Sequence, residues 1–172
     1  MSAKTILITG STDGIGKATA RELLAHGHRV VLHGRNEGKG QKVIKELAQE
    51  TGHEPSRYFN ADLSSQNSIH RLADELAAFF PLLDVLMNNA GTYQPERHVT
   101  EEGAELTFAV NYLAPFMLTL LLRDTLQKSA SARVVNVAST AHRDVYRLEW
   151  ENLQGERRGT IRGMRIPSPS SP

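Results

Sequence analysis

The sequence predicts an α/β fold, a doubly wound parallel sheet of five strands (Rossmann-like) with helices on both faces. Two observations predict this fold. Short β-branched or apolar runs alternate with longer helical patterns along the 172 residues, and such alternation is typical of parallel βαβ units. In addition, a glycine-rich segment follows the first apolar run directly and opens the first helical pattern, which is where such folds place a ligand-binding turn.

The expected elements follow one another in a regular order. The strands are expected in runs rich in β-branched residues, at residues 4–9, 29–33, 57–61, 83–88 and 132–139. The helices are expected between them, at residues 15–26, 37–51, 65–79 and 106–121. The run at 132–139 is apolar nearly throughout, which is the pattern of a strand covered on both faces.

The helix expected at 106–121 has the clearest periodicity in the chain. Its apolar residues recur with the i, i+3, i+4, i+7 spacing of one buried stripe, at Leu106, Ala109, Val110, Leu113, Met117, Leu120 and Leu121. Pro115 lies inside this pattern. Because proline removes a backbone donor, we expect a kink there.

Composition excludes several classes of protein. The 20 basic and 19 acidic residues leave a net charge of +1, so nothing favours a nucleic-acid or membrane partner. Cysteine is absent, which excludes disulfides and thiolate chemistry. The seven histidines have no metal-ligand spacing, and we expect no metal. No apolar run approaches the ~18 residues of a spanning helix. A soluble cytoplasmic protein is therefore expected.

The segment "TGSTDGIGK" after the first strand is a candidate phosphate-binding turn. Its glycines permit a sharp turn, a close approach of the backbone to a pyrophosphate, and close helix–strand packing. The helix that begins there directs free N–H groups and its positive end at the anion. A glycine-rich turn without a ligand is the alternative. The candidate cofactor-binding residues of this segment are Thr9, Gly10, Ser11, Asp13, Gly14, Ile15 and Gly16.

The end of the second strand indicates which nucleotide binds. An acidic residue there would hold a ribose 2′-hydroxyl, whereas arginine accommodates a 2′-phosphate. The segment "VVLHGRNEG" supplies Arg35 and no acid at the required place, and Lys17 is a possible second cation. Both could instead be ordinary solvated charges. We expect NADP(H), with NAD the alternative.

Five motifs in order resemble the short-chain dehydrogenases/reductases, and most closely their retinol-dehydrogenase-like branch. They are "TGSTDGIG" (9–16), "ADLSS" (61–65), "NNAG" (88–91), Asn111 in "FAVNYLAPF", and "VVNVASTAH" (134–142). The resemblance implies an oxidoreductase that transfers hydride between NADP(H) and an alcohol or carbonyl. It also implies a homodimer or tetramer for a full-length chain.

The resemblance assigns further site residues. Asp62 and Leu63 would flank the adenine, and the cofactor cleft would be lined by Asn88, Asn89, Ala90 and Gly91. Asn111 would sit at the helix kink and hold a proton-relay water through its backbone carbonyl, and Ser139 would hydrogen-bond the substrate oxygen. From the residues alone, the two asparagines would indicate a turn and Ser139 a polar strand end.

The resemblance stops before the motif that moves the proton. In this family a tyrosine acts as acid or base, four residues before a lysine that lowers its pKa. After Ser139 the 172 residues offer only Tyr146, whose fourth following residue is Trp150, and no lysine follows Lys128. A non-catalytic NAD(P)-binding module or an inactive fragment is therefore the alternative to an active oxidoreductase.

The boundary is expected near Gly159, between an incomplete nucleotide-binding domain (1–158) and a tail (159–172) whose end, "IPSPSSP", is typical of disorder. Possible codons for Ile166 to Pro172 (ATA CCC AGT CCA AGC TCG CC), read one nucleotide earlier after a T, encode Tyr-Thr-Gln-Ser-Lys-Leu-Ala. That frame contains the missing motif, so we expect a reading-frame slip. A natural disordered tail or a cloning scar is the alternative.

Overall fold

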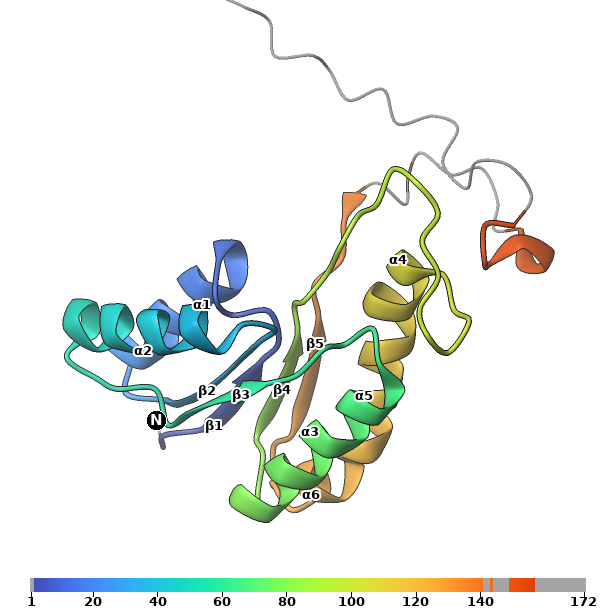
Figure 1. The fold of residues 1–172 in the computed structure, drawn as a ribbon. Helices are drawn as coiled ribbons and strands as arrows, with labels where there is room; N and C mark the ends of the chain where they lie inside the picture. Colours follow the sequence, from blue (N-terminus) through green and yellow to red (C-terminus); the bar gives the residue numbers. More distant parts are fainter. Residues whose placement is uncertain (1, 141–142, 144–148, 157–172) are drawn as a thin grey trace, which may run out of the picture. The chain divides into compact units, whose positions relative to one another are not determined.

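The computed structural model describes residues 2–140, 143 and 149–156. The chain divides into two compact units, residues 1–137 and 138–172. The first unit contains one five-stranded sheet in the order β3-β2-β1-β4-β5 (Figure 1). Its strands are β1 (Thr5–Ile8), β2 (Arg29–Gly34), β3 (Arg57–Asn60), β4 (Val85–Asn88) and β5 (Arg133–Asn136).

All strand pairs are parallel, with Ile6 of β1 aligned to Val30 of β2 and to Val85 of β4. The order of the strands reverses between β1 and β4, and such a switch point is where open α/β sheets bind their ligands. The doubly wound parallel sheet expected from the sequence is therefore confirmed, and the carboxyl ends of β1 and β4 are the place to look for a site.

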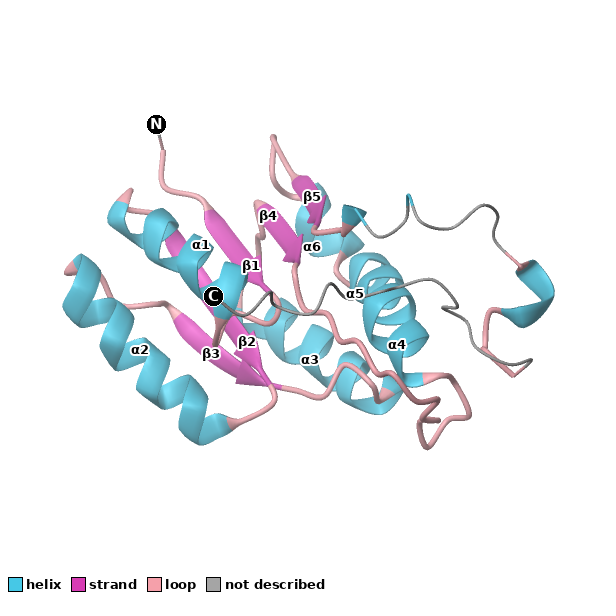
Figure 2. Cartoon of the chain, turned by 90° about the horizontal axis from the view of Figure 1, so that it is seen from above, coloured by secondary structure: helices cyan, strands magenta, loops and turns pink. Residues whose placement is uncertain are grey.

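Helices cover both faces of the sheet (Figure 2). One face carries α1 (Gly14–Ala25) and α2 (Glu37–Thr51); the other carries α3 (Gln66–Phe79), α4 (Leu106–Phe108), α5 (Ala114–Leu121) and α6 (Arg123–Gln127). Each face has its own core of buried apolar residues. The three long helices begin at the polar N-cap residues Asp13, Asn36 and Ser65. Each of these side chains accepts a hydrogen bond from a backbone N–H group in the first turn of its helix. None of the described helices is long and apolar enough to cross a bilayer.

The buried stripe of the long helical segment differs from the prediction. Residues Ala109–Leu113 form a π-helical turn, and Pro115 lies in the first turn of α5 that follows. After this turn the buried positions are Ala114, Leu118 and Leu122, whereas Leu120 is 54% exposed. The helix is interrupted at this π turn, before Pro115, and the kink expected at Pro115 stays a prediction. Met117 packs against a core cluster as expected. The expected burial of Leu120 and Leu121 was wrong, because the wider π turn shifts the buried face.

Strand β5 also differs from the prediction. All four of its residues are exposed, with Val134 at 41% and Val135 at 42%. Neither core cluster of the described residues contains a residue of β5. The expectation of a strand covered on both faces was therefore wrong for the described part of the chain.

In the second unit, a 3₁₀-helical turn η3 spans Trp150–Asn152, and Ser139 lies near the start of this unit. The division into compact units falls after Val137. The expected domain boundary near Gly159, Tyr146 and the segment 159–172 fall outside the described residues, so they stay predictions.

Candidate functional site

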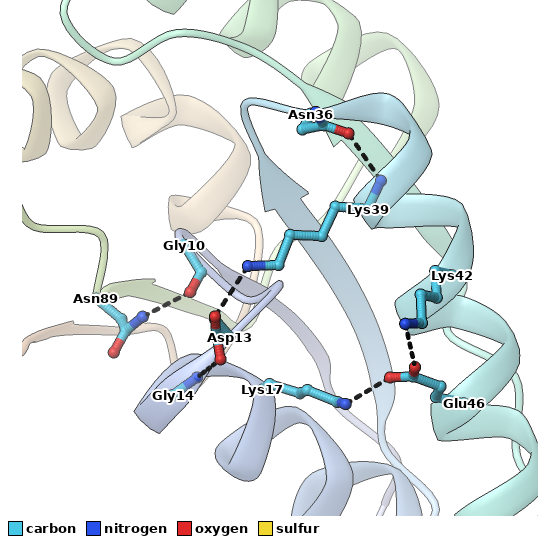
Figure 3. Close-up of polar contacts among 9 residues, drawn as sticks. All are labelled: Gly10, Asp13, Gly14, Lys17, Asn36, Lys39, Lys42, Glu46 and Asn89. Carbon is cyan, nitrogen blue, oxygen red and sulfur yellow. Dashed lines mark hydrogen bonds and ion pairs between the residues drawn. The ribbon is translucent and has the colours of Figure 1, made fainter.

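The loops after β1 and β4 are joined by hydrogen bonds at the carboxyl edge of the sheet. The Thr9 hydroxyl oxygen accepts the backbone N–H groups of Asn89 and Ala90, both at 3.0 Å. In return, the Asn89 side-chain Nδ2 donates to the Thr9 carbonyl at 2.8 Å and to the Gly10 carbonyl at 3.1 Å (Figure 3). The structure thus brings together two of the segments singled out from the sequence.

Close packing explains two glycines of this turn. Gly10 has φ +63°, and a Cβ there would lie 2.8 Å from the Cα of Ala90. A Cβ on Gly16 would overlap the carbonyl oxygen of Gly10. Both positions therefore exclude larger residues because of contacts within the protein, and the turn is compact without a ligand.

The N-terminus of α1 is the candidate anion site of this edge. Asp13 is the N-cap, and its Oδ1 accepts the Gly14 N–H at 2.8 Å. The remaining N–H groups of a first helical turn have no intrahelical acceptor and carry the positive end of the helix dipole. The backbone here has the features that bind phosphate groups in other proteins.

Three cations near this turn, Lys17, Lys39 and Arg35, differ in their partners; Figure 3 shows the contacts of the two lysines. Lys17 forms a 2.6 Å ion pair with Glu46, and this hydrogen bond lowers the pKa of the Glu46 carboxyl. Lys39, in the first turn of α2, reaches Asp13 at 2.9 Å and holds the Asp13 pKa low. Among the described residues, none forms an ion pair with Arg35, which follows β2 and is exposed.

Lys39 is a site residue that the sequence reasoning missed. Lys17 was singled out as the second cation, but the structure directs it to Glu46. Lys39 instead contacts the glycine turn through Asp13. Its place in the first turn of the helix that follows Arg35 is the signal that could have found it, since that turn lies at the same edge of the sheet.

A second missed residue is His33, in β2. Its imidazole is 1% exposed; Nδ1 accepts the Gly10 N–H at 3.2 Å, and Nε2 lies 3.2 Å from the Ala61 carbonyl oxygen. Burial lowers the pKa of His33 to about 4, opposed by the Ala61 hydrogen bond and Asp62 and assisted by Arg35. The side chain is therefore neutral at physiological pH.

Ser11 also uses its polar groups within the protein. Its hydroxyl oxygen accepts the His33 backbone N–H at 2.9 Å, and its own N–H donates to the His33 carbonyl at 2.9 Å. Ser11 is fully buried. Its expected contact with a cofactor stays a prediction.

The segment after β3 turns at the same edge. Asp62 Oδ1 accepts the N–H and the hydroxyl of Ser64, at 2.9 and 2.8 Å. Leu63 is buried in one of the two core clusters. The Asp62 carboxylate thus shapes its own turn, and the expected contacts of both residues with adenine stay predictions.

Asn88 ends β4 and links three elements. Its buried Nδ2 donates to Asn136 Oδ1 of β5 at 2.9 Å and to Thr119 Oγ1 of α5 at 3.3 Å. Among the described residues, no group donates to Asn88 Oδ1. Asn88 therefore helps to hold the β4–β5 end of the edge, with Asn136 and Thr119 as partners that the sequence reasoning missed.

Asn111 lies in the π turn, as expected for a residue at the kink. Its amide makes a two-way contact with Thr92, accepting the backbone N–H and donating to the carbonyl, both at 2.8 Å. This contact ties the segment after Gly91 to the helix. The water-holding role of Asn111 and the catalytic role of Ser139, which belongs to the second unit, stay predictions.

No group of three or more His, Asp or Glu side chains in the described part of the chain could hold a metal ion. The site is therefore built from a glycine turn, a helix N-terminus, amides and cations. The sequence model of short chain dehydrogenases matches residues 4–149. The chain belongs to the short-chain dehydrogenase family.

The curated relatives of this member include several retinol dehydrogenases. The chain is 41% identical to human retinol dehydrogenase 11 over 157 residues, which is 91% of the chain and 49% of that protein. It is 39% identical to mouse retinol dehydrogenase 12 over 155 residues, 90% of the chain and 49% of that protein. The retinol-dehydrogenase-like resemblance is confirmed, and the chain spans about half the length of these relatives.

Solved structures of the family share the fold. A short chain dehydrogenase from Escherichia coli CFT073, complexed with NADPH, superposes with a TM-score of 0.72 at 31% identity. The match covers 90% of this chain and 66% of the Escherichia coli chain. A short chain dehydrogenase from Shigella flexneri 2a, complexed with NADP, has a TM-score of 0.71 at 30% identity. The match covers 87% of this chain and 64% of the Shigella chain.

Proposed function

We propose that this chain is the NADP(H)-binding part of an oxidoreductase that interconverts an alcohol and a carbonyl. The observation that carries the proposal is the turn over the N-terminus of α1, in which Gly10 packs against Ala90. Two cations, Arg35 and Lys39, lie at the end of the adjoining strand β2. A guanidinium and an ammonium at that place suit a 2′-phosphate. The NADP- and NADPH-bound relatives support the same cofactor.

The proposed reaction consists of a hydride transfer and a proton transfer. The cofactor, when bound, supplies or accepts the hydride. Ser139 holds the substrate oxygen and Asn111 a water on the proton path, by resemblance to the family. The group that exchanges the proton is expected in a Tyr-x-x-x-Lys motif, which these 172 residues lack. We therefore expect cofactor binding by this chain, without turnover.

A non-catalytic nucleotide-binding module is the second candidate. It is favoured by the contrast between a glycine turn that is hydrogen-bonded to β2 and to the loop after β4 and the missing Tyr-x-x-x-Lys motif. Turnover by the purified chain tests the expectation, common to both candidates, that these 172 residues bind the cofactor without catalysis. NADPH oxidation with a panel of aldehydes and ketones would establish an active enzyme and contradict our expectation.

Cofactor choice is tested by titrating the chain with NADPH and with NADH, followed by the nucleotide's fluorescence. We expect R35M to weaken NADPH about tenfold and K39M by less, because each loses a charge-assisted contact, while NADH is unaffected. The matched control is K17M. Lys17 is held by Glu46 in an ion pair that is less exposed than the Lys39–Asp13 pair, so its loss should leave the preference unchanged.

The outcomes separate the alternatives. Equal affinity for both nucleotides, unchanged in R35M and K39M, would contradict the preference for NADP(H) but keep a nucleotide site. A folded chain that binds neither nucleotide would contradict both candidate functions. Binding of NADPH without turnover is the result that both candidates predict for this chain.

A further inference from the structure

His33 lies between two loops of the candidate nucleotide edge. Its Nδ1 accepts the N–H of Gly10 in the turn after β1, and its Nε2 faces the carbonyl of Ala61, which follows β3 and precedes Asp62. The backbone of His33 is bonded to Ser11 in both directions. One residue of β2 is therefore joined to the loops that follow the strands on each side of it.

These contacts fix the protonation of the ring. The Gly10 N–H is a donor, so Nδ1 must be an unprotonated acceptor, and the Ala61 carbonyl is an acceptor, so Nε2 must carry the proton. Only the neutral Nε2–H tautomer satisfies both. Doubly protonated imidazole would place two N–H donors against each other and lose the bond to Gly10.

We propose that His33 is a positioning residue for the nucleotide: by accepting the Gly10 N–H and donating to the Ala61 carbonyl, it holds the phosphate turn and the adenine-side loop in register. The inference rests on the proposed function, since it names how that site is kept in a binding-competent form. The polar atoms carry the role, not the volume of the ring.

The hydrogen bonds of His33 indicate that an apolar side chain of the same volume cannot replace the imidazole. An apolar side chain of similar size would leave the part-buried Gly10 N–H without an acceptor, and the turn would be free to adopt other conformations. A ligand that binds only one of several conformations has a lower apparent affinity. The affinity is reduced in proportion to the fraction of protein molecules that are in the binding conformation. A glutamine amide offers both an acceptor and a donor, so it can replace the imidazole in kind.

The first test uses the full 172-residue chain and no nucleotide. Two-bond ¹H–¹⁵N spectra should show His33 as the neutral Nε2–H tautomer, and the Gly10 amide should be protected from hydrogen exchange. We expect that protection to fall about tenfold in H33L and to be kept in H33Q, because the loss of one intramolecular hydrogen bond has about that effect.

The second test measures NADPH affinity in the same variants. We expect about tenfold weaker binding by H33L and near-normal binding by H33Q. The matched control is V31A, because Val31 is fully buried in the same strand, two residues earlier, and contacts no residue of the turn through a hydrogen bond. V31A should lower the melting temperature and leave affinity unchanged.

The two tests separate failure of the inference from failure of the proposed function. An Nδ1–H tautomer, or unchanged Gly10 protection and NADPH affinity in H33L, would overturn the positioning role while nucleotide binding stands. A wild-type chain with the expected tautomer and protection that binds no nucleotide would overturn the proposed function, and with it the purpose we assign to His33.

Discussion

Strands β2 and β5 are both apolar in sequence, but the structure places them in opposite environments. Val30, Val31 and Leu32 of β2 are fully buried, with β1 and β3 on either side and a core cluster on each face. In β5, Val134 and Val135 are exposed, and within the described residues the strand pairs only with β4. The same residue types thus contribute very different amounts of buried apolar area.

The comparison shows which polar groups of the candidate site are hydrogen-bonded within the described residues. At the end of β2, His33, Ser11 and Gly10 satisfy one another's polar groups. At the end of β4, beside β5, the buried Oδ1 of Asn88 has no donor among the described residues. These polar groups at the end of β2 are therefore paired with one another, whereas Asn88 Oδ1 has no donor among the described residues.

The largest effect is expected from G10A. It combines a left-handed backbone with a Cβ placed 2.8 Å from the Ala90 backbone, and we expect a loss of about 2–5 kcal/mol in the free energy of unfolding. Gly52 gives the matched control, since it has φ +72° and open space around its Cβ position; G52A should cost only about 1–2 kcal/mol. Urea unfolding of both variants measures the difference, and equal losses would contradict the close-packing argument.

A slightly smaller effect is expected from acid. The pKa of His33 falls from 6.5 to about 4 on folding, so the unfolded chain binds the proton first as the pH falls. The stabilisation is complete above about pH 6.5 and is lost progressively down to about pH 4, in total about 3 kcal/mol. Urea unfolding at a series of pH values, compared with H33Q, isolates this contribution. Parallel pH curves for the two proteins would contradict it.

The smallest effect compares the two strands directly. V31A removes two methyl groups from a fully buried site and should cost about 2 kcal/mol. V135A makes the same change at a side chain that is 42% exposed and should cost about 0.5 kcal/mol. Thermal or urea unfolding gives both values. Equal costs would show that β5 is covered in solution by groups other than the described residues.

Much of the fold could be predicted because it depends on local patterns. Each expected strand and helix is present, and α2 has the predicted bounds, Glu37–Thr51, since Asn36 caps its start and Gly52 its end. The expected burial of Leu120 and Leu121 was wrong, because a π turn at Ala109–Leu113 cannot be recognised from apolar spacing. The exposure of β5 depends on which elements pack beside it, which periodicity does not report.

The sequence by itself determined the glycine turn, its place after the first strand, and the family to which the chain belongs. Only the tertiary structure decided that Lys39 reaches the turn while Lys17 pairs with Glu46, and that His33 joins Gly10 to Ala61. The physical reason is range. Turn chemistry and periodicity act over a few residues, whereas these partners lie 23 to 29 positions apart and meet only when parallel strands bring their carboxyl ends to one edge.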